Sequence, residues 1–482
     1  MTESDTRSDV VVIGGGIAGL VAANRAAQLG KSVILLEKGT DEKYPCNTRW
    51  TGGTFHIHFT DPLSNRDKLL SVIESATKGF AHKELAQALA EDSPRLIQWL
   101  WSEGIRTINL GGYHTCILAP PSRTGPGLEW EGRGGDVMLR TLEANLRKLG
   151  GRLVRGARAR ALDLSSPDGV VVDAECGGKT TYFRAGDVVI ADGGFPADPE
   201  LIRAHISPHP EKILRRNAGT ATGDGFRMAM AVGAAVTGGL DCFYGHLLSR
   251  DAMRNNRLWP RPYLDALVTS GIVIDGEGRR FADEGNGGVY MANAVARLND
   301  PLSATLVFDH ATWTGPGAKS IIPANPHLPN GGGTIHKAQT IAELAGMIGV
   351  PAQTLQEVVD NYNRALDSGT LDRLSPPRRS DWQVTVFSNK ALPIKVAPFY
   401  AVPVCTGITH IMGGIAIDAN SAVLDKNNKP IPHLYAAGTA TGGLEGGPAI
   451  GYLGGLTKSG VTGLRAAERI AQLSSPTGSQ GA

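Results

Sequence analysis

Hydrophobic and polar positions near the start of the chain predict a strand, a helix and a second strand. Residues 10–13 are a β-branched apolar run typical of a buried parallel strand. A stretch rich in Ala follows from Ile17 to Leu29 with helical spacing, and Gly30 ends it. Residues 32–37, SVILLE, form the second apolar run. This order is typical of an α/β unit with a parallel sheet.

Strand-like runs return far along the chain. The segments 185–199 and 432–447 each contain a short apolar strand that runs into glycines. Between them the alternation breaks, because residues 238–394 are richer in Pro, Asn, Trp and His. Residues 340–369 nevertheless have the spacing of two amphipathic helices, separated by Pro351. We therefore expect a second structural unit in the middle of the chain.

The composition narrows the function classes. Of the 482 residues, 62 are glycine, or about 13% against a usual share of about 7%, which indicates tight turns and close contacts between backbone and ligand. Lys plus Arg total 48 and Asp plus Glu total 46. Nucleic-acid-binding proteins normally carry a basic excess. The sequence therefore predicts no nucleic-acid partner.

Cysteines and apolar runs exclude further classes. The five cysteines are scattered without a CxxC pair, which argues against a zinc or iron–sulfur site and predicts no metal. The N-terminal MTESDTRSD is polar and acidic, unlike a signal sequence. No apolar run reaches the roughly 18 residues of a membrane span. We predict a soluble, cytoplasmic protein without a membrane partner and with a disordered tail at residues 474–482.

Glycines directly after the first strand indicate a ligand. Gly14, Gly16 and Gly19 form a GxGxxG motif at the start of the predicted helix, and Glu37 ends the second strand. The first glycine allows a tight turn, the second lets a pyrophosphate approach, and the third lets the helix pack closely on the strand. The helix N-terminus offers N–H groups to phosphate, and Glu37 can accept a hydrogen bond from a ribose hydroxyl. This motif predicts dinucleotide binding, and the acid at position 37 disfavours NADP.

The glycine-rich stretch 442–456, GGLEGGPAIGYLGGL, favours FAD over NAD. A nicotinamide enzyme seldom needs its C-terminal part to return to the first nucleotide-binding sheet. FAD is longer, and a distant segment with little side-chain bulk can reach its pyrophosphate and ribityl chain. We therefore predict that the two ends of the chain converge on one FAD.

Five groups of residues resemble the fumarate reductase/succinate dehydrogenase flavoprotein superfamily, nearly from end to end. They are VVVIGGGIAGL with ILLEK, VVIADGGF, GTATGDGFRMAMAVGA, GRRFADE, and GITHIMGGIAID followed by PIPHLYAAGTATGG. The superfamily includes soluble fumarate reductases, tricarballylate dehydrogenase and 3-ketosteroid dehydrogenases. The resemblance implies an α/β fold, in which a Rossmann-like FAD-binding domain of the glutathione-reductase type (residues 1–237 and 395–482) carries an inserted α+β cap domain (residues 238–394).

The resemblance and the glycine motif together imply a set of FAD contacts. His56 and His58 lie near the place where some membrane-bound members attach flavin covalently, but the pattern of that attachment is missing, so we expect noncovalent FAD. The predicted contacts are Gly14, Gly16, Ile17, Ala18, Gly19, Glu37, Lys38, Thr48, Thr51, Gly52, Gly53, Ala159, Ala191, Gly193, Asp224, Gly414, Gly438, Thr439 and Ile450.

The catalytic residues of the soluble fumarate reductases are only partly matched. Their proton-donating arginine corresponds to Gly288, and the arginine that holds a substrate carboxylate corresponds to the region of Tyr452. The resemblance to 3-ketosteroid dehydrogenases instead implies Tyr290 and Tyr452 as catalytic, one as a base and one at the ketone oxygen. His410 matches a histidine that contacts substrate in the reductases.

Other polar residues near these motifs have open roles. Arg49 and Arg133 are cations for which a surface position and a carboxylate contact are equally expected. Tyr113 and His114 lie in a loop that resembles one folded over the substrate, and Glu445 is the only carboxylate in the glycine-rich stretch.

The leading hypothesis is an FAD-dependent oxidoreductase acting on CH–CH groups. It would desaturate a small-molecule ketone or keto acid next to its carbonyl, by hydride transfer to flavin N5, with a tyrosine as base or acid. One alternative is an ene-reductase or dehydrogenase of a carboxylic acid, like fumarate reductase or tricarballylate dehydrogenase. Another is a non-catalytic FAD electron-transfer subunit, although no CxxCH haem motif is present. The electron acceptor and the oligomeric state stay open.

Overall fold

A computed structural model describes residues 6–122, 127–166, 169–319, 322–379 and 390–473. Its largest sheet has eight strands, five of which are parallel neighbours in the order β17-β9-β1-β2-β6. The strand β16 pairs antiparallel with β17, and β7 and β8 extend the sheet from β9. The strands are β1 (Arg7–Ile13), β2 (Val33–Glu37), β6 (Arg152–Arg155), β7 (Ala157–Asp163), β8 (Val170–Cys176), β9 (Lys179–Ile190), β16 (Ala422–Leu424) and β17 (Pro430–Ala436).

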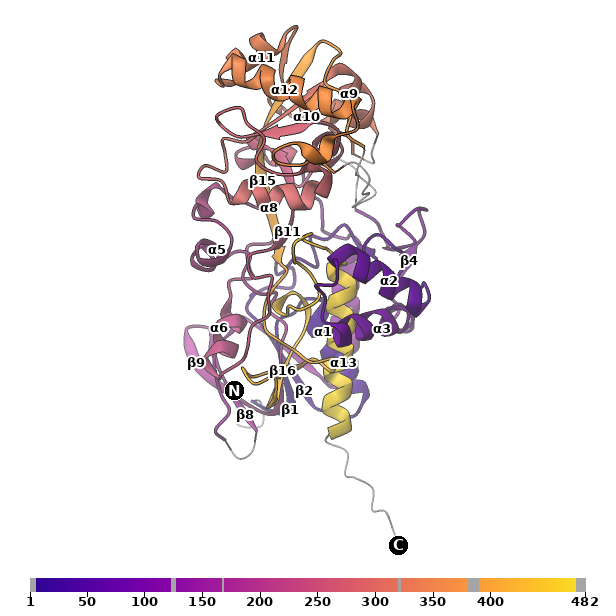
Figure 1. Cartoon of the computed structure of the whole chain (residues 1–482). Coiled ribbons are helices and arrows are strands. Elements are labelled where there is room, and N and C mark those ends of the chain that lie inside the picture. The colour runs from indigo at the N-terminus through magenta and orange to yellow at the C-terminus, as the bar shows by residue number, and fades with distance from the viewer. Residues whose placement is uncertain (1–5, 123–126, 167–168, 320–321, 380–389, 474–482) are drawn as a thin grey trace.

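Helices cover this sheet and bring the two ends of the chain together. The helix α1 (Ile17–Gln28) packs against α13 (Gly455–Leu473), and Figure 1 shows the two side by side. A Cβ at Gly463 would lie 2.5 Å from Ala18 O, so glycine allows this close approach. The other helices of this part are α2 (Arg66–Thr77), α3 (Lys83–Ser102), α4 (Gly134–Lys148), α5 (Pro199–His205) and α6 (Asp224–Ala231).

A second sheet of six strands is organised around one long strand, β15 (Phe399–Ile411). Three strands pair antiparallel with β15, and eleven of its thirteen residues are buried, so it is the central strand of this sheet. The other strands are β10 (Leu214–Arg215), β11 (Phe243–Ser249), β12 (Ile272–Ile274), β13 (Thr305–Asp309) and β14 (His336–Ala338). A small third sheet contains β3 (Thr54–Phe55), β4 (Thr107–Ile108) and β5 (Cys116–Leu118).

The helices α11 (Ile341–Ile348) and α12 (Ala352–Asp367) flank Pro351 as predicted. Their apolar faces form a separate small core with β12 and β15, far from β1 and β2 in Figure 1. The remaining helices of this part are α7 (Asp265–Ser270), α8 (Gly288–Ala296), α9 (His310–Thr314) and α10 (Ala324–Asn330).

The α/β class with a parallel sheet is confirmed, and α1 ends within one residue of the prediction. The proposed domain boundaries stay a prediction, and β10 and β15 join the second sheet from outside residues 238–394. Among the described residues no helix has the length and apolarity needed to cross a membrane. The predicted disorder of the tail falls outside the described residues.

Candidate active site

A groove runs along the carboxyl ends of β1, β2 and β9, at the start of α1. We call it the glycine groove; it is lined by residues 13–18, 36–38, 45–48, 157–159, 191–193, 220, 221, 224, 439 and 459. Gly14 has a φ of +109°, and a Cβ there would lie 2.5 Å from Ala191 O. A Cβ at Gly19 would overlap Gly14 O. The first and third glycines of the motif are therefore required by the backbone turn and by the packing of the helix, as the motif predicted.

Glu37 shapes one wall of the glycine groove. Its two carboxylate oxygens accept hydrogen bonds from Gly15 N at 2.8 Å and Gly39 N at 2.7 Å. Burial raises the pKa of Glu37, and these two N–H donors oppose the effect. The carboxylate is thus held at the end of β2, beside the turn that opens α1.

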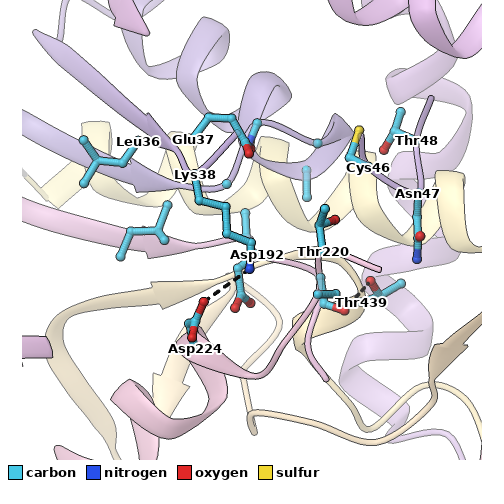
Figure 2. A pocket seen from close by; sticks show the side chains of 18 of the residues that line it. Leu36, Glu37, Lys38, Cys46, Asn47, Thr48, Asp192, Thr220, Asp224 and Thr439 are labelled. Carbon is cyan, nitrogen blue, oxygen red and sulfur yellow. Dashed lines mark hydrogen bonds and ion pairs between the residues drawn. The ribbon is translucent and has the colours of Figure 1, made fainter. Parts of the chain in front are cut away.

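Lys38 and Asp224, both predicted cofactor contacts, bind each other across the glycine groove at 3.2 Å (Figure 2). Arg158 also donates two hydrogen bonds to Asp224, at 2.7 and 2.9 Å. Burial alone would raise the pKa of Asp224, but the two cations outweigh it and lower the pKa. This side of the groove carries two positive groups and one negative group.

A second hollow, the aromatic cleft, continues from the glycine groove. Ile17, Asn47, Thr48, Thr439 and Ser459 line both. The aromatic side chains of the cleft are Trp50, Phe59, Tyr113, Trp130, Tyr244, Trp259, Tyr263 and Tyr452. The two hollows form one long slot, and the N-terminus of α1 lies where they join. Gly16 provides no side-chain cap there, and Ile17 N donates to Thr48 Oγ1 at 3.1 Å. This shape fits a long dinucleotide whose pyrophosphate lies at the N-terminus of α1.

Most of the predicted cofactor contacts line this slot. Those on the glycine groove are Gly14, Gly16, Ile17, Ala18, Glu37, Lys38, Thr48, Ala159, Ala191, Gly193, Asp224 and Thr439. Thr51, Gly52 and Gly53 line the aromatic cleft.

Four predicted contacts, Gly19, Gly414, Gly438 and Ile450, do not line the slot. Three of them have structural surroundings: a Cβ at Gly414 would overlap Ala440 O, Gly438 has a φ of +73°, and Ile450 packs with buried apolar residues. These residues support the packing around the slot and do not line it.

The predicted catalytic residues are separated. Tyr452 and His410 line the aromatic cleft, with ring centroids 5.8 Å apart. Tyr290 lies on α8, half-buried against two apolar groups of residues, and does not line the cleft. Burial raises the pKa of Tyr452 and lowers the pKa of His410.

Two arginines line the aromatic cleft, which corrects the expectation that hydroxyl groups replace guanidinium groups there. Arg216 follows β10, and Arg261 comes from the loop before α7. Arg216 donates to Thr409 Oγ1 at 2.6 Å and to the Tyr263 hydroxyl at 2.7 Å. Burial alone would raise the pKa of Tyr263, but Arg216 and Arg261 outweigh it and lower the pKa below 10. The two guanidinium groups come from segments that the sequence motifs do not include.

The open roles of the remaining polar residues are largely settled by their contacts. Arg49 is fully buried in ion pairs with Asp136 and Glu143, so it is neither a surface residue nor a substrate contact. Glu445 is buried in an ion pair with Lys458 at 2.8 Å, and its Oε2 lies 3.6 Å from His410 Nε2. Tyr113 and His114 line the aromatic cleft, as their predicted loop requires.

The chain matches the model of the FAD-binding domain family over residues 9–451. It belongs to this family. The predicted flavoprotein superfamily and the predicted cofactor, FAD, are thereby confirmed, and no group of His, Cys, Asp or Glu among the described residues is arranged to hold a metal ion.

Several known proteins are similar to this chain along almost its whole length. A probable fumarate reductase of Shewanella frigidimarina is 28% identical over 91% of this chain and 71% of its own length. A 4-oxocyclohexanecarboxylate 2-dehydrogenase of Sinomonas cyclohexanicum is 26% identical over 92% of this chain and 89% of its own length. The crystal structure of a 3-ketosteroid-Δ4-(5α)-dehydrogenase from Rhodococcus jostii superposes with a TM-score of 0.72 at 24% identity and covers 98% of both chains. The protein is an FAD-dependent oxidoreductase.

Replacing Glu37 by alanine is expected to weaken FAD binding by about 10- to 100-fold. The change removes the acceptor of the Gly15 and Gly39 N–H groups and the predicted acceptor of a ribose hydroxyl, and hydrogen bonds to charged groups contribute about 1.5–3 kcal/mol. Fluorescence titration of the FAD-free protein with FAD measures the dissociation constant. Glu42→Ala, an exposed acid on the following loop, is the control; equal affinities of the two variants would contradict the role of Glu37.

Proposed function

We propose that the protein desaturates a cyclic keto acid at the carbon–carbon bond next to its carbonyl. The observation that carries this proposal is the joint placement of two arginines and four tyrosines in the aromatic cleft, directly beyond the glycine groove. Bound FAD supplies the two-electron acceptor for such a reaction. The protein's own groups bind the two polar ends of the substrate and remove one proton.

The carboxylate end is assigned to Arg216 and Arg261. Guanidinium groups suit a carboxylate because their N–H donors match its two oxygens. Arg216 is held in place by Thr409 and Tyr263, so its position is fixed before substrate binds. The neighbouring Tyr263 hydroxyl lies close to both arginines and adds a polar group to the lining of the cleft.

The carbonyl end is assigned to Tyr452 and His410. The Tyr452 ring stacks on the Tyr244 ring with centroids 3.7 Å apart, and its hydroxyl accepts a hydrogen bond from Gly455 N at 3.2 Å. That hydroxyl can therefore donate its own proton to a ketone oxygen, where charge develops when the adjacent carbon loses a proton. Burial lowers the pKa of His410, so this ring is neutral near pH 7 and also suits a ketone.

One apolar wall of the cleft suits a ring. Trp50 and Trp259 meet edge to face at 5.5 Å, and Trp130, Leu128 and Ile322 continue the apolar surface. The indole N–H groups of Trp50 and Trp259 are buried and have no hydrogen-bond partner among the described residues. A flat or cyclic apolar body with a polar edge fits such a wall. The named 4-oxocyclohexanecarboxylate dehydrogenase, which is similar along the chain, supports this class.

A second candidate function is reduction of an unsaturated acid, favoured by the arginine pair and by the similarity to a probable fumarate reductase. The cofactor is held without a covalent bond in either case. The Nδ1 atoms of His56 and His58 are engaged by Phe59 N and Tyr452 O at 3.0 Å, which supports noncovalent binding.

Anaerobic mixing of the oxidised enzyme with 4-oxocyclohexanecarboxylate tests the proposal. We expect the visible absorbance of FAD to bleach, while cyclohexanone and cyclohexanecarboxylate, which each lack one polar end, act at least 10-fold more weakly. Arg261→Met is expected to raise the substrate concentration for half-maximal bleaching by about 10- to 100-fold, since one charge-assisted contact is lost. If only the reduced enzyme reacts, and only with unsaturated acids, the second candidate is correct.

A further inference from the structure

We propose that Tyr244 is the catalytic base and that His246 and Asp265 activate it as a hydrogen-bonded relay. This inference rests on the proposed function, for which it names the proton acceptor. None of the three residues belongs to a motif that the sequence singled out. Tyr244 and Asp265 line the aromatic cleft, and His246, on β11, contacts both of them.

The three side chains form an unbroken chain of contacts. The Tyr244 hydroxyl lies 3.0 Å from His246 Nε2, and His246 Nδ1 lies 3.1 Å from both carboxylate oxygens of Asp265. Asp265 accepts a hydrogen bond from the Nδ1–H group of His246. Nε2 of the neutral ring then carries no proton and can accept a hydrogen bond from the tyrosine hydroxyl. The direction of each hydrogen bond thus prepares the ring to take the proton of Tyr244.

The backbone fixes this alignment. Tyr244 and His246 are two residues apart on β11, so their side chains lie on the same face of the strand. A Cβ at Gly288, the first residue of α8, would overlap the carboxylate of Asp265. Only glycine at this position leaves room for the carboxylate next to the histidine.

Burial keeps the imidazole and the phenol of the relay neutral. His246 is 3% exposed and Asp265 is 2% exposed. The charged and titratable groups around the imidazole are Asp265, Tyr244, Tyr263, Arg216 and Arg261. Burial lowers the pKa of His246 more than Asp265 raises it, so the ring is neutral near pH 7 and free to accept a proton. Burial also raises the pKa of Tyr244, so its hydroxyl keeps its proton until substrate is bound.

The proposed step conserves atoms and charge. The C–H bond beside the substrate carbonyl breaks and its proton goes to the Tyr244 oxygen, while the Tyr244 proton goes to His246 Nε2. The electron pair of the C–H bond moves onto the carbonyl oxygen as enolate charge near Tyr452. The imidazolium that results lies against Asp265, which stabilises its positive charge. No external reductant or oxidant takes part in this proton transfer.

Exchange of the substrate's α-protons with deuterated solvent, followed by NMR, measures the proton transfer directly. With FAD-loaded enzyme and 4-oxocyclohexanecarboxylate, Tyr244→Phe is expected to slow both exchange and flavin bleaching by about 10²- to 10⁴-fold, the usual contribution of a general base. Tyr182→Phe, on the exposed face of β9, is the control and should change neither rate more than twofold. Tyr244→Phe that folds, binds FAD and exchanges as fast as the control would overturn the proposal.

The positioning residues have their own test. His246→Asn is expected to abolish the acid limb of the exchange rate, which in the unmodified protein lies below pH 6.5 because burial lowers the pKa of His246. Asp265→Asn is expected to remove the far-downfield proton signal of the buried Nδ1–H. His433→Asn is the control, since His433 and Asp187 form a similar pair at 3.4 Å on the surface. An acid limb unchanged in His246→Asn would exclude the relay.

Failure of the relay and failure of the proposed function are separable. If no compound of the panel bleaches FAD or exchanges its protons, the proposed substrate is wrong. The downfield proton signal then still decides the relay without substrate: its presence in the unmodified protein, its loss in Asp265→Asn and its shift in Tyr244→Phe support the relay, and its absence overturns it.

Discussion

Replacing Gly19 by valine is expected to give a protein that contains no FAD and unfolds far more easily. A Cβ at this position would overlap the carbonyl oxygen of Gly14, and the two further methyl groups of valine would push α1 away from β1. Forcing extra groups into close-packed regions typically costs about 1–3 kcal/mol, and a clash with backbone lies at the upper end because backbone cannot rotate away. The displaced helix would also move its N-terminus from the pyrophosphate. Visible absorbance of the purified protein and its thermal unfolding curve measure both effects.

Gly346→Ala is the matched control for Gly19. Gly346 lies inside α11, and a Cβ there meets nothing within 4 Å. We expect normal FAD content and equal or slightly higher stability, because alanine is the better helix former. A Gly19→Val protein that binds FAD with the affinity of the control would show that the third glycine is not required for packing.

The nucleotide-binding half of the fold could be predicted because its signals are local. Gly14, Gly19 and Glu37 lie within 24 residues of one another; the two glycines have the close backbone contacts that the motif requires, and Glu37 lies at the groove beside them. The predicted meeting of the two chain ends is seen in the packing of α1 against α13. Here β1, the glycine turn, α1 and β2 follow one another in the sequence and also contact one another in the fold.

The catalytic side of the slot could not be predicted in the same way, because its residues come from separate loops. Arg216 and Arg261 are 45 positions apart, and neither occupies the place where the reductases carry an arginine. Their meeting depends on the pairing of β10 with β15 and on the loop before α7. No linear motif in the sequence therefore records where these two arginines meet.

The structure gives a physical reason for glycine at position 288. From the sequence, this glycine is interpreted only as the loss of the reductases' arginine. In the structure the absent side chain makes room for the Asp265 carboxylate, which contacts His246. Tyr290, chosen by its spacing from Glu284, lies two residues further along α8 and faces apolar neighbours, whereas Tyr244 on β11 lines the cleft. The sequence alone did not show whether residues at the start of α8 point toward the cleft or toward the apolar core.

Replacing Lys458 by methionine is expected to lower the free energy of unfolding by about 3–5 kcal/mol, because it leaves a buried carboxylate without its cation. Lys458 Nζ lies 2.8 Å from Glu445 Oε2, and both side chains are at most 1% exposed. The double variant Lys458→Met with Glu445→Gln should recover much of the loss, since no unpaired charge remains. Lys395→Met, which removes a half-exposed pair with Asp367 at 2.6 Å, is the control and should cost less than about 1 kcal/mol.

The pH dependence of this loss identifies the buried pair as its cause. Burial would raise the pKa of Glu445, but Lys458 and His410 outweigh it and hold the pKa far below 4.5. A carboxyl whose pKa is depressed by folding stabilises the protein above its unfolded value, and this stability is lost as the pH falls below 4.5. Urea unfolding at saturating FAD should therefore show the gap between the unmodified protein and Lys458→Met narrowing by up to about 1.4 kcal/mol per pH unit below that value. A gap that stays constant down to about pH 3 would mean that lost packing around the lysine stem, and not the charge of Glu445, destabilises the variant.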